Sequence, residues 1–175
     1  MQPVPLGLVA QGRLYVLGQP VRTAPCRIDS IGPNESTWRR EPDGPTGMWA
    51  LAGSELDGVL FVCAPVRGLV AYSPTDRKWS ILGGPAAPRS PQVVAWNSEL
   101  WIMGGRDIED GKQVLIYRPS DRTWRKGPSL PRPLAWGAAA SDDGAIYLIG
   151  GAAGSGTGDN PYHYSDMAFR WTHRG

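Results

Sequence analysis

One short pattern, repeated four times, constrains this chain more than any other feature of its 175 residues. The clearest copy lies at residues 99–124. There an apolar run ends at Gly104-Gly105, a polar loop follows, and a second apolar run ends at Tyr117, seven residues before Trp124. Paired glycines permit positive φ and a close backbone approach. The apolar runs favour short strands, and the run at 92–96 adds another. The pattern therefore predicts four antiparallel strands in succession.

The same pattern recurs along the chain with different completeness. The four copies span about residues 7–42, 46–83, 90–127 and 134–175. Their aromatic markers are Trp38, Trp79, Trp124 and Trp171, at spacings of 41, 45 and 47 residues. A period of this size, with strand signals in every copy, is typical of a β-propeller, in which each four-stranded sheet is one blade. The glycine pair recurs as Gly150-Gly151, but Gly18-Gln19 and Ala64-Pro65 replace it in the first two copies.

The end of the fourth copy has two interpretations. Tyr164 and Trp171 are seven residues apart, as in the second and third copies, which favours a complete fourth blade. Against it, residues 167–169 have poor turn chemistry and lack a proline. The alternative places Trp171 in the tyrosine position and leaves the last strand missing. In the second copy, the first strand is predicted at 49–52.

The glycine pair, the tyrosine and the tryptophan together resemble the kelch-repeat family over nearly the whole chain. The resemblance implies an all-β fold, a kelch-type β-propeller array of about four four-stranded blades in a single domain, residues 1–175. Because kelch propellers usually have five to seven blades, we expect an incomplete propeller. A small four-bladed ring and an assembly completed by another chain are the alternatives. Unclosed blades expose sheet edges and apolar faces, which predicts possible self-association.

The recurring glycines and aromatic residues are predicted to be structural. Large indole rings can fill the gap between adjacent sheets, and a spacing that recurs in every blade favours a core position over a ligand cage. This set comprises Trp38, Trp79, Gly104, Gly105, Tyr117, Trp124, Gly150, Gly151 and Trp171.

Function is expected on one face of the array. Because strand direction alternates within a blade, the loops after the second strands and the connections between blades emerge together, on what we call the loop face. Loops on a rigid scaffold commonly carry binding. The candidate binding residues are Arg67, Arg89, Arg106, Asp107, Glu109 and Arg132. Their guanidinium groups could pair with carboxylates of a protein partner, or they could pair locally or stay solvated. The resemblance implies a non-catalytic module for protein–protein interaction.

Catalytic signals are sparse. Only His163 and His173 are present, and no nucleophile elbow, zinc motif or phosphate loop occurs. We therefore expect no enzyme activity and no cofactor or metal. The resemblance leaves one alternative, a carbohydrate-active propeller similar to sialic acid epimerases. A copper site of galactose oxidase type is not supported, because it needs paired Tyr and His ligands and a thioether-linked Cys.

Composition bears on secondary structure, on nucleic-acid binding and on the location of the protein in the cell. With 23 Gly and 17 Pro, few segments could sustain a helix. The net charge of +2 comes from interspersed residues without a basic stripe, which argues against nucleic-acid binding. No apolar run approaches the roughly 20 residues that span a bilayer, and no secretory signal is evident, so we expect a cytoplasmic protein. Cys26 and Cys63 are then expected to be buried free thiols, with a disulfide between them as the alternative.

Overall fold

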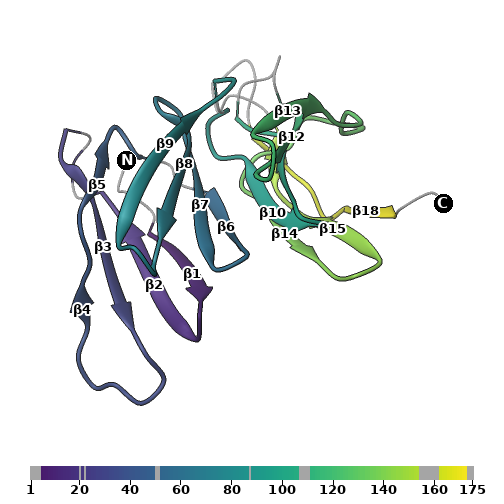
Figure 1. The fold of residues 1–175 in the computed structure, drawn as a ribbon. Coiled ribbons are helices and arrows are strands. Elements are labelled where there is room, and N and C mark those ends of the chain that lie inside the picture. The colour runs from purple at the N-terminus through teal and green to yellow at the C-terminus, as the bar shows by residue number, and fades with distance from the viewer. Residues whose placement is uncertain are drawn as a thin grey trace. The chain divides into compact units, whose positions relative to one another are not determined.

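The computed structural model contains strands and turns and no helix in the part of the chain that it describes. That part comprises residues 5–19, 21, 23–49, 52–86, 88–106, 111–153 and 162–172. The chain divides into two compact units, Met1–Ala87 (unit 1) and Pro88–Gly175 (unit 2). Within the described residues, two antiparallel sheets of each unit correspond to two predicted repeats (Figure 1), and unit 2 has a further two-stranded ladder. The predicted fold class, an all-β array of about four blades, is confirmed.

Unit 1 contains blades 1 and 2, and each follows chain order across its sheet. Blade 1 consists of β1 (Leu6–Ala10), β2 (Arg13–Gly18), β3 (Pro25–Ile31) and β4 (Arg39–Arg40), with β5 (Gly44–Thr46) also paired to β3. Blade 2 consists of β6 (Ala52–Leu56), β7 (Val59–Ala64), β8 (Gly68–Ser73) and β9 (Lys78–Gly83).

Unit 2 contains blades 3 and 4. Blade 3 consists of β10 (Gln92–Trp96), β11 (Glu99–Met103), β12 (Val114–Arg118) and β13 (Thr123–Lys126). Blade 4 consists of β14 (Ala138–Ser141), β15 (Ala145–Ile149) and β18 (Ala168–Thr172). A separate ladder joins β16 (Ala152–Ala153) to β17 (His163–Tyr164).

Two-residue turns set the strand register in the first three blades. Asp57 and Gly58 have φ of 52° and 79°, the positive values that a tight hairpin turn with matching strand twist requires. They pair Leu56 with Val59 and fix β6 by counting back from the turn. The bounds of the predicted first strand of blade 2, at 49–52, are therefore wrong, because β6 is Ala52–Leu56 and Trp49 lies in no strand; residues 50 and 51 lie outside the described residues. Periodicity alone placed the strand too far from its turn.

The two sheets of unit 1 pack face to face through apolar side chains. Tyr15, Leu17 and Ile28 of blade 1 form one buried cluster with Leu60 and Tyr72 of blade 2. The rings of Tyr15 and Tyr72 meet edge to face with centroids 6.2 Å apart. This contact buries one face of each sheet, which neither blade could cover alone.

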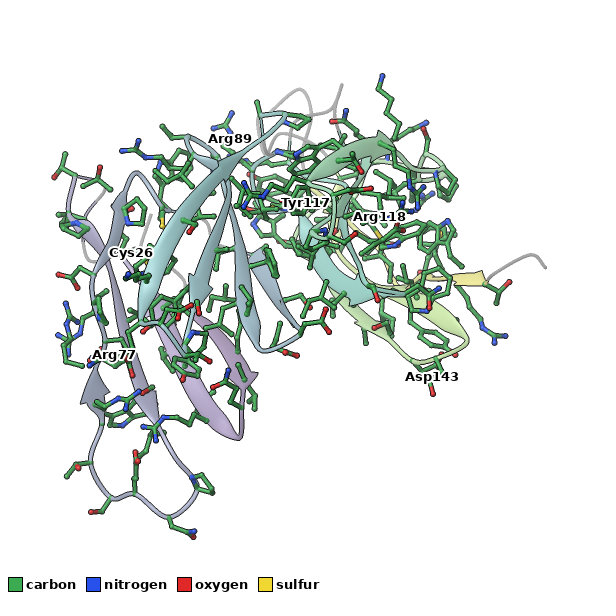
Figure 2. The ribbon with its side chains drawn as sticks, viewed as in Figure 1. Cys26, Arg77, Arg89, Tyr117, Arg118 and Asp143 are labelled. Carbon is green, nitrogen blue, oxygen red and sulfur yellow. The ribbon has the colours of Figure 1, made fainter. Side chains whose placement is uncertain are left out.

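Glu41 is a buried carboxylate that links these two blades. The Ser30 hydroxyl and Arg39 Nε each donate to its Oε1 at 2.7 Å. The Tyr72 hydroxyl and Arg77 Nε of blade 2 each donate to its Oε2 at 2.9 Å; Arg77 is labelled in Figure 2. Burial by itself raises the pKa of Glu41, but these hydrogen bonds outweigh it and lower the pKa to about 2, from an ordinary 4.5. The carboxylate therefore remains charged inside the interface.

Equivalent tryptophans in blades 1 and 2 have different surroundings. Trp79 lies with its ring centroid 5.0 Å from that of Tyr72, and its Nε1 donates to the Pro42 carbonyl of the preceding repeat at 2.9 Å. Trp38 is 51% exposed, so its predicted burial between sheets is wrong. The reason is that Ile31 replaces the tyrosine and, among the described residues of unit 1, no sheet covers that face of blade 1.

Unit 2 has its own core. Val94, Met103 and Ile116 of blade 3 form a buried cluster with Ile146 and Leu148 of blade 4. The rings of Tyr117 and Trp124 of blade 3 have centroids 4.8 Å apart. Tyr117 is labelled in Figure 2.

The fourth blade follows the alternative interpretation of its sequence. Trp171 pairs with Ile146 on the third strand of the sheet, the position that Tyr117 occupies in blade 3. Tyr164 instead pairs with Ala152 outside the blade and is 84% exposed. The predicted pairing of Tyr164 with Trp171 is wrong, and blade 4 has three strands within the described residues. The spacing matched by chance, because the turn chemistry that the pairing needs is absent.

The predicted state of the cysteines is confirmed. Cys26 and Cys63 are buried free thiols, and burial raises the pKa of Cys26 to about 11 and that of Cys63 to about 12. Neither thiol is suited to act as a nucleophile.

The paired tryptophans allow a matched stability test. We expect Trp79→Ala to lower the free energy of unfolding by about 3 kcal/mol, because it removes a packed ring and a hydrogen bond. Trp38→Ala should lower it by less than about 1 kcal/mol, because the ring is largely exposed. Urea unfolding of both variants at low protein concentration measures the difference, and equal losses would contradict it.

The charge on Glu41 predicts a pH dependence. Because its folded pKa of about 2 lies below the ordinary 4.5, the carboxylate contributes stability above about pH 4.5 that is lost as the pH falls toward 2. Urea unfolding at several pH values should show a shallower decline for Glu41→Gln than for the native chain. Asp143→Asn is the control, because Asp143 is exposed in the turn between β14 and β15. A native pH profile retained in Glu41→Gln would contradict the assignment.

Candidate binding site on the loop face

In unit 2, backbone hydrogen bonds gather the segments of the loop face. Arg106 N, just after β11, donates to the Arg89 carbonyl at 2.7 Å, and Gly105 N donates to the Leu134 carbonyl at 2.7 Å. Gly105 adopts a φ of 140°, and a Cβ there would overlap Pro88. Figure 2 shows Arg89 and the Asp143 turn toward opposite ends of the sheets of this unit. The glycine pair thus lets the inter-blade connections close over the end of β11.

The side chains at this end form a cluster of one cation and two aromatic rings. The guanidinium carbon of Arg106 lies 5.6 Å from the ring centroid of Trp136. Tyr162 meets the same indole edge to face, with centroids 5.0 Å apart and planes at 89°. Trp136 is nevertheless 44% exposed. We call Arg106, Trp136 and Tyr162 the aromatic cluster.

The backbone of Trp136 is held in an unusual conformation. Its φ is 55°, in the left-handed region that bulky side chains rarely adopt. Trp136 N donates to the Ser90 carbonyl at 3.4 Å, and Ala135 exchanges two backbone hydrogen bonds with Ala152 at 2.8 Å. These contacts hold the segment and aim the indole outward. Strain of this kind often accompanies a functional position.

The arrangement can bind an apolar group beside an anion. An exposed indole offers a large flat apolar surface, and a guanidinium stacked near it stays fully charged and pairs readily with carboxylates. Such a pair of residues is common where proteins recognise partners.

The predicted binding residues have different positions. The backbones of Arg89 and Arg106 are joined by a hydrogen bond, and the Arg106 side chain lies over Trp136 in the aromatic cluster. Arg132 is exposed in the connection to blade 4, where Leu130 N and Leu134 N donate to the carbonyls of residues 112 and 111. Asp107 and Glu109 lie outside the described residues.

Arg67 belongs to unit 1 and follows the alternative of local pairing. Its Nε donates to the Thr46 carbonyl at 2.8 Å, and its Nη2 donates to Thr46 Oγ1 at 2.9 Å. This residue joins a hairpin turn of blade 2 to β5.

The sequence analysis missed Trp136 and Tyr162. The available signal was that Trp136 lies outside the tryptophan spacing and follows Arg132 in the connection between blades. That signal is incomplete by itself, because Trp96 and Trp101 also lie outside the spacing and are buried in the core of unit 2.

The described residues contain no group of three or more His, Cys, Asp or Glu placed to hold a metal ion. Within those ranges, no helix is long and apolar enough to cross a membrane.

Comparison with known proteins gives consistent similarities. No protein-family model matches the chain. Kelch-like protein 33 of Homo sapiens is 31% identical over 121 residues, which cover 63% of this chain and 22% of that protein. N-acetylneuraminate epimerase of Haemophilus influenzae is 29% identical over 124 residues, which cover 63% of this chain and 33% of that protein. The chain therefore spans only a fifth to a third of these curated relatives.

A solved structure supports the fold. The structure of YjhT matches with a TM-score of 0.76 at 17% identity, over 95% of this chain and 68% of that chain. The match over part of that chain agrees with the expected incomplete propeller. The repeated motif, the antiparallel blades and these similarities together confirm the resemblance of this chain to kelch-repeat β-propellers.

Proposed function

We propose that this protein is a non-catalytic interaction module that binds a protein partner through the loop face of unit 2. The observation that carries the proposal is the exposed, strained Trp136 with Arg106 stacked against it. A buried indole would be explained by core packing. Binding of a ligand explains an indole that is exposed and held in a strained backbone conformation. The similarity to Kelch-like protein 33 is in keeping with a kelch-type binding module.

The chemistry of the aromatic cluster defines the partner. Arg106 and the neighbouring Arg89 supply positive charge, and Trp136 supplies an apolar platform. We therefore expect a segment that presents a carboxylate next to an aromatic or aliphatic side chain. Exposed aromatic and arginine anchors of this kind commonly dominate binding energy. We also propose that the protein is cytoplasmic and can associate through open blade edges. Binding at the loop face can be tested independently of both.

A second candidate function is binding or conversion of an acidic sugar. It is favoured by the similarity to N-acetylneuraminate epimerase. An indole face can stack on a sugar ring, and a guanidinium can pair with a sugar carboxylate. The same cluster would then hold a small ligand instead of a protein segment.

A binding experiment distinguishes the two candidates. Peptides selected from a random display library on the full chain, and N-acetylneuraminic acid as a separate probe, would be titrated calorimetrically. We expect acidic peptides with an apolar anchor to bind, and Trp136→Ala and Arg106→Ala to weaken them about tenfold or more. Lys126→Ala, on the exposed strand β13, is the control and should leave binding unchanged. Saturable sugar binding without peptide binding would favour the second candidate, and variants that bind peptides like the native chain would refute the proposed site.

The strain at Trp136 predicts a separation of stability from binding. Trp136→Gly should be more stable than Trp136→Ala by about 1 kcal/mol, because glycine adopts positive φ without steric cost. Both variants should lose binding, because both lack the indole. Urea unfolding midpoints check the order of stability. An alanine variant as stable as the glycine variant would show that the backbone at this position is not strained.

A further inference from the structure

Blade 1 has one covered face and one open face. The open face carries a row of side chains in register across the sheet, in which Val9 pairs with Leu14 and Leu14 with Ile31. Ser30 pairs with Arg39, so the next position places Trp38 beside Ile31. Val9, Leu14 and Trp38 are 61%, 38% and 51% exposed. We call Val9, Leu14, Ile31 and Trp38 the open row.

The equivalent row of blade 2 is already an interface. Glu55 pairs with Leu60, Leu60 with Tyr72, and Tyr72 with Trp79. Leu60 and Tyr72 are fully buried and pack in one cluster with Tyr15 and Leu17 of blade 1. This row is therefore the one by which a blade docks on the sheet before it. The open row of blade 1 has the same register and a similar apolar character but has no sheet against it in unit 1.

Blade 4 presents the matching receiving face. Its side toward blade 3 carries Ile146, Leu148 and Trp171, so Tyr147 and Ile149 point to the opposite side, where Ile149 is 54% exposed. Tyr147 and Ile149 follow Gly144 as Tyr15 and Leu17 follow Gly12. In the pairing across the sheet, Tyr147 lies between Ala140 and Arg170, and Ile149 between Ala138 and Ala168. This side of blade 4 repeats the surface of blade 1 that accepts blade 2.

We propose that the open row of blade 1 docks on the outer face of blade 4 in a second copy of this chain. The two surfaces correspond to the two sides of an interface already present in unit 1. Because they are different surfaces, the contact is head to tail, and two copies can form two equivalent contacts. This association is separate from loop-face binding and does not depend on it.

Sedimentation velocity of the full chain over a range of concentrations tests the proposal. We expect the native chain, of 18.9 kDa, to form a dimer. Trp38→Glu and Ile149→Glu should each weaken dimerisation at least about tenfold, because a buried unpaired charge replaces an apolar contact. Val66→Glu is the matched control, because Val66 is 65% exposed in the β7–β8 turn, away from both surfaces, and it should dimerise like the native chain.

Mixing the two variants tests the head-to-tail geometry. A Trp38→Glu copy retains its blade 4 surface and an Ile149→Glu copy retains its open row, so the mixture should recover one contact and form dimers that neither variant forms alone. Melting curves at the lowest concentration should match that of Val66→Glu, which shows that the variants fold. A native chain that stays monomeric would overturn the proposal. A dimer that persists in both variants, or a mixture without recovery, would also overturn it.

Discussion

Packing of one blade's apolar row against the sheet before it is the interaction on which this fold depends. A four-stranded kelch sheet has apolar side chains on both faces, so it is stable only when neighbouring sheets cover them. In unit 1, Leu60 and Tyr72 supply the row, and Tyr15 and Leu17 supply the surface that receives it. The short turns and the glycine pairs serve this contact, because they set the register that brings the row into line.

A buried carboxylate adds hydrogen bonds to the apolar contact between blades 1 and 2. Desolvation of a carboxylate is costly unless donors satisfy its oxygens, and Glu41 receives them from both blades of unit 1. In blade 3, Glu99 accepts hydrogen bonds from Arg118 at 2.9 Å and Arg125 at 2.6 Å within one sheet. Glu41 therefore fixes one sheet against another, whereas Glu99 fixes strands within a sheet. A slip between blades 1 and 2 would remove the Tyr72 and Arg77 donors and leave Oε2 of Glu41 unpaired.

The sequence predicts features that depend on local chemistry and misses those that depend on a neighbour. The repeated strand–turn–strand pattern located the blades, because turn residues and apolar runs determine local structure over a few positions. Trp38 follows the same grammar as Trp79 but is exposed, since burial requires a second sheet that its own repeat cannot supply. Tyr164 has the expected spacing from Trp171, yet Trp171 pairs with Ile146. Spacing identifies candidates for a row, and only strand pairing decides which residue belongs to it.

Two exposed tryptophans now have different physical explanations. Trp38 lies in the register of a docking row, where the equivalent Trp79 packs on the preceding sheet, so its exposure reflects a missing neighbour of the same kind. Trp136 lies outside the repeat period, has a φ of 55° and contacts Arg106 and Tyr162. A further blade would not need that conformation, because neither Trp38 nor Trp79 has positive φ. Exposure alone would group these residues, but register and backbone conformation separate a surface for assembly from a surface for recognition.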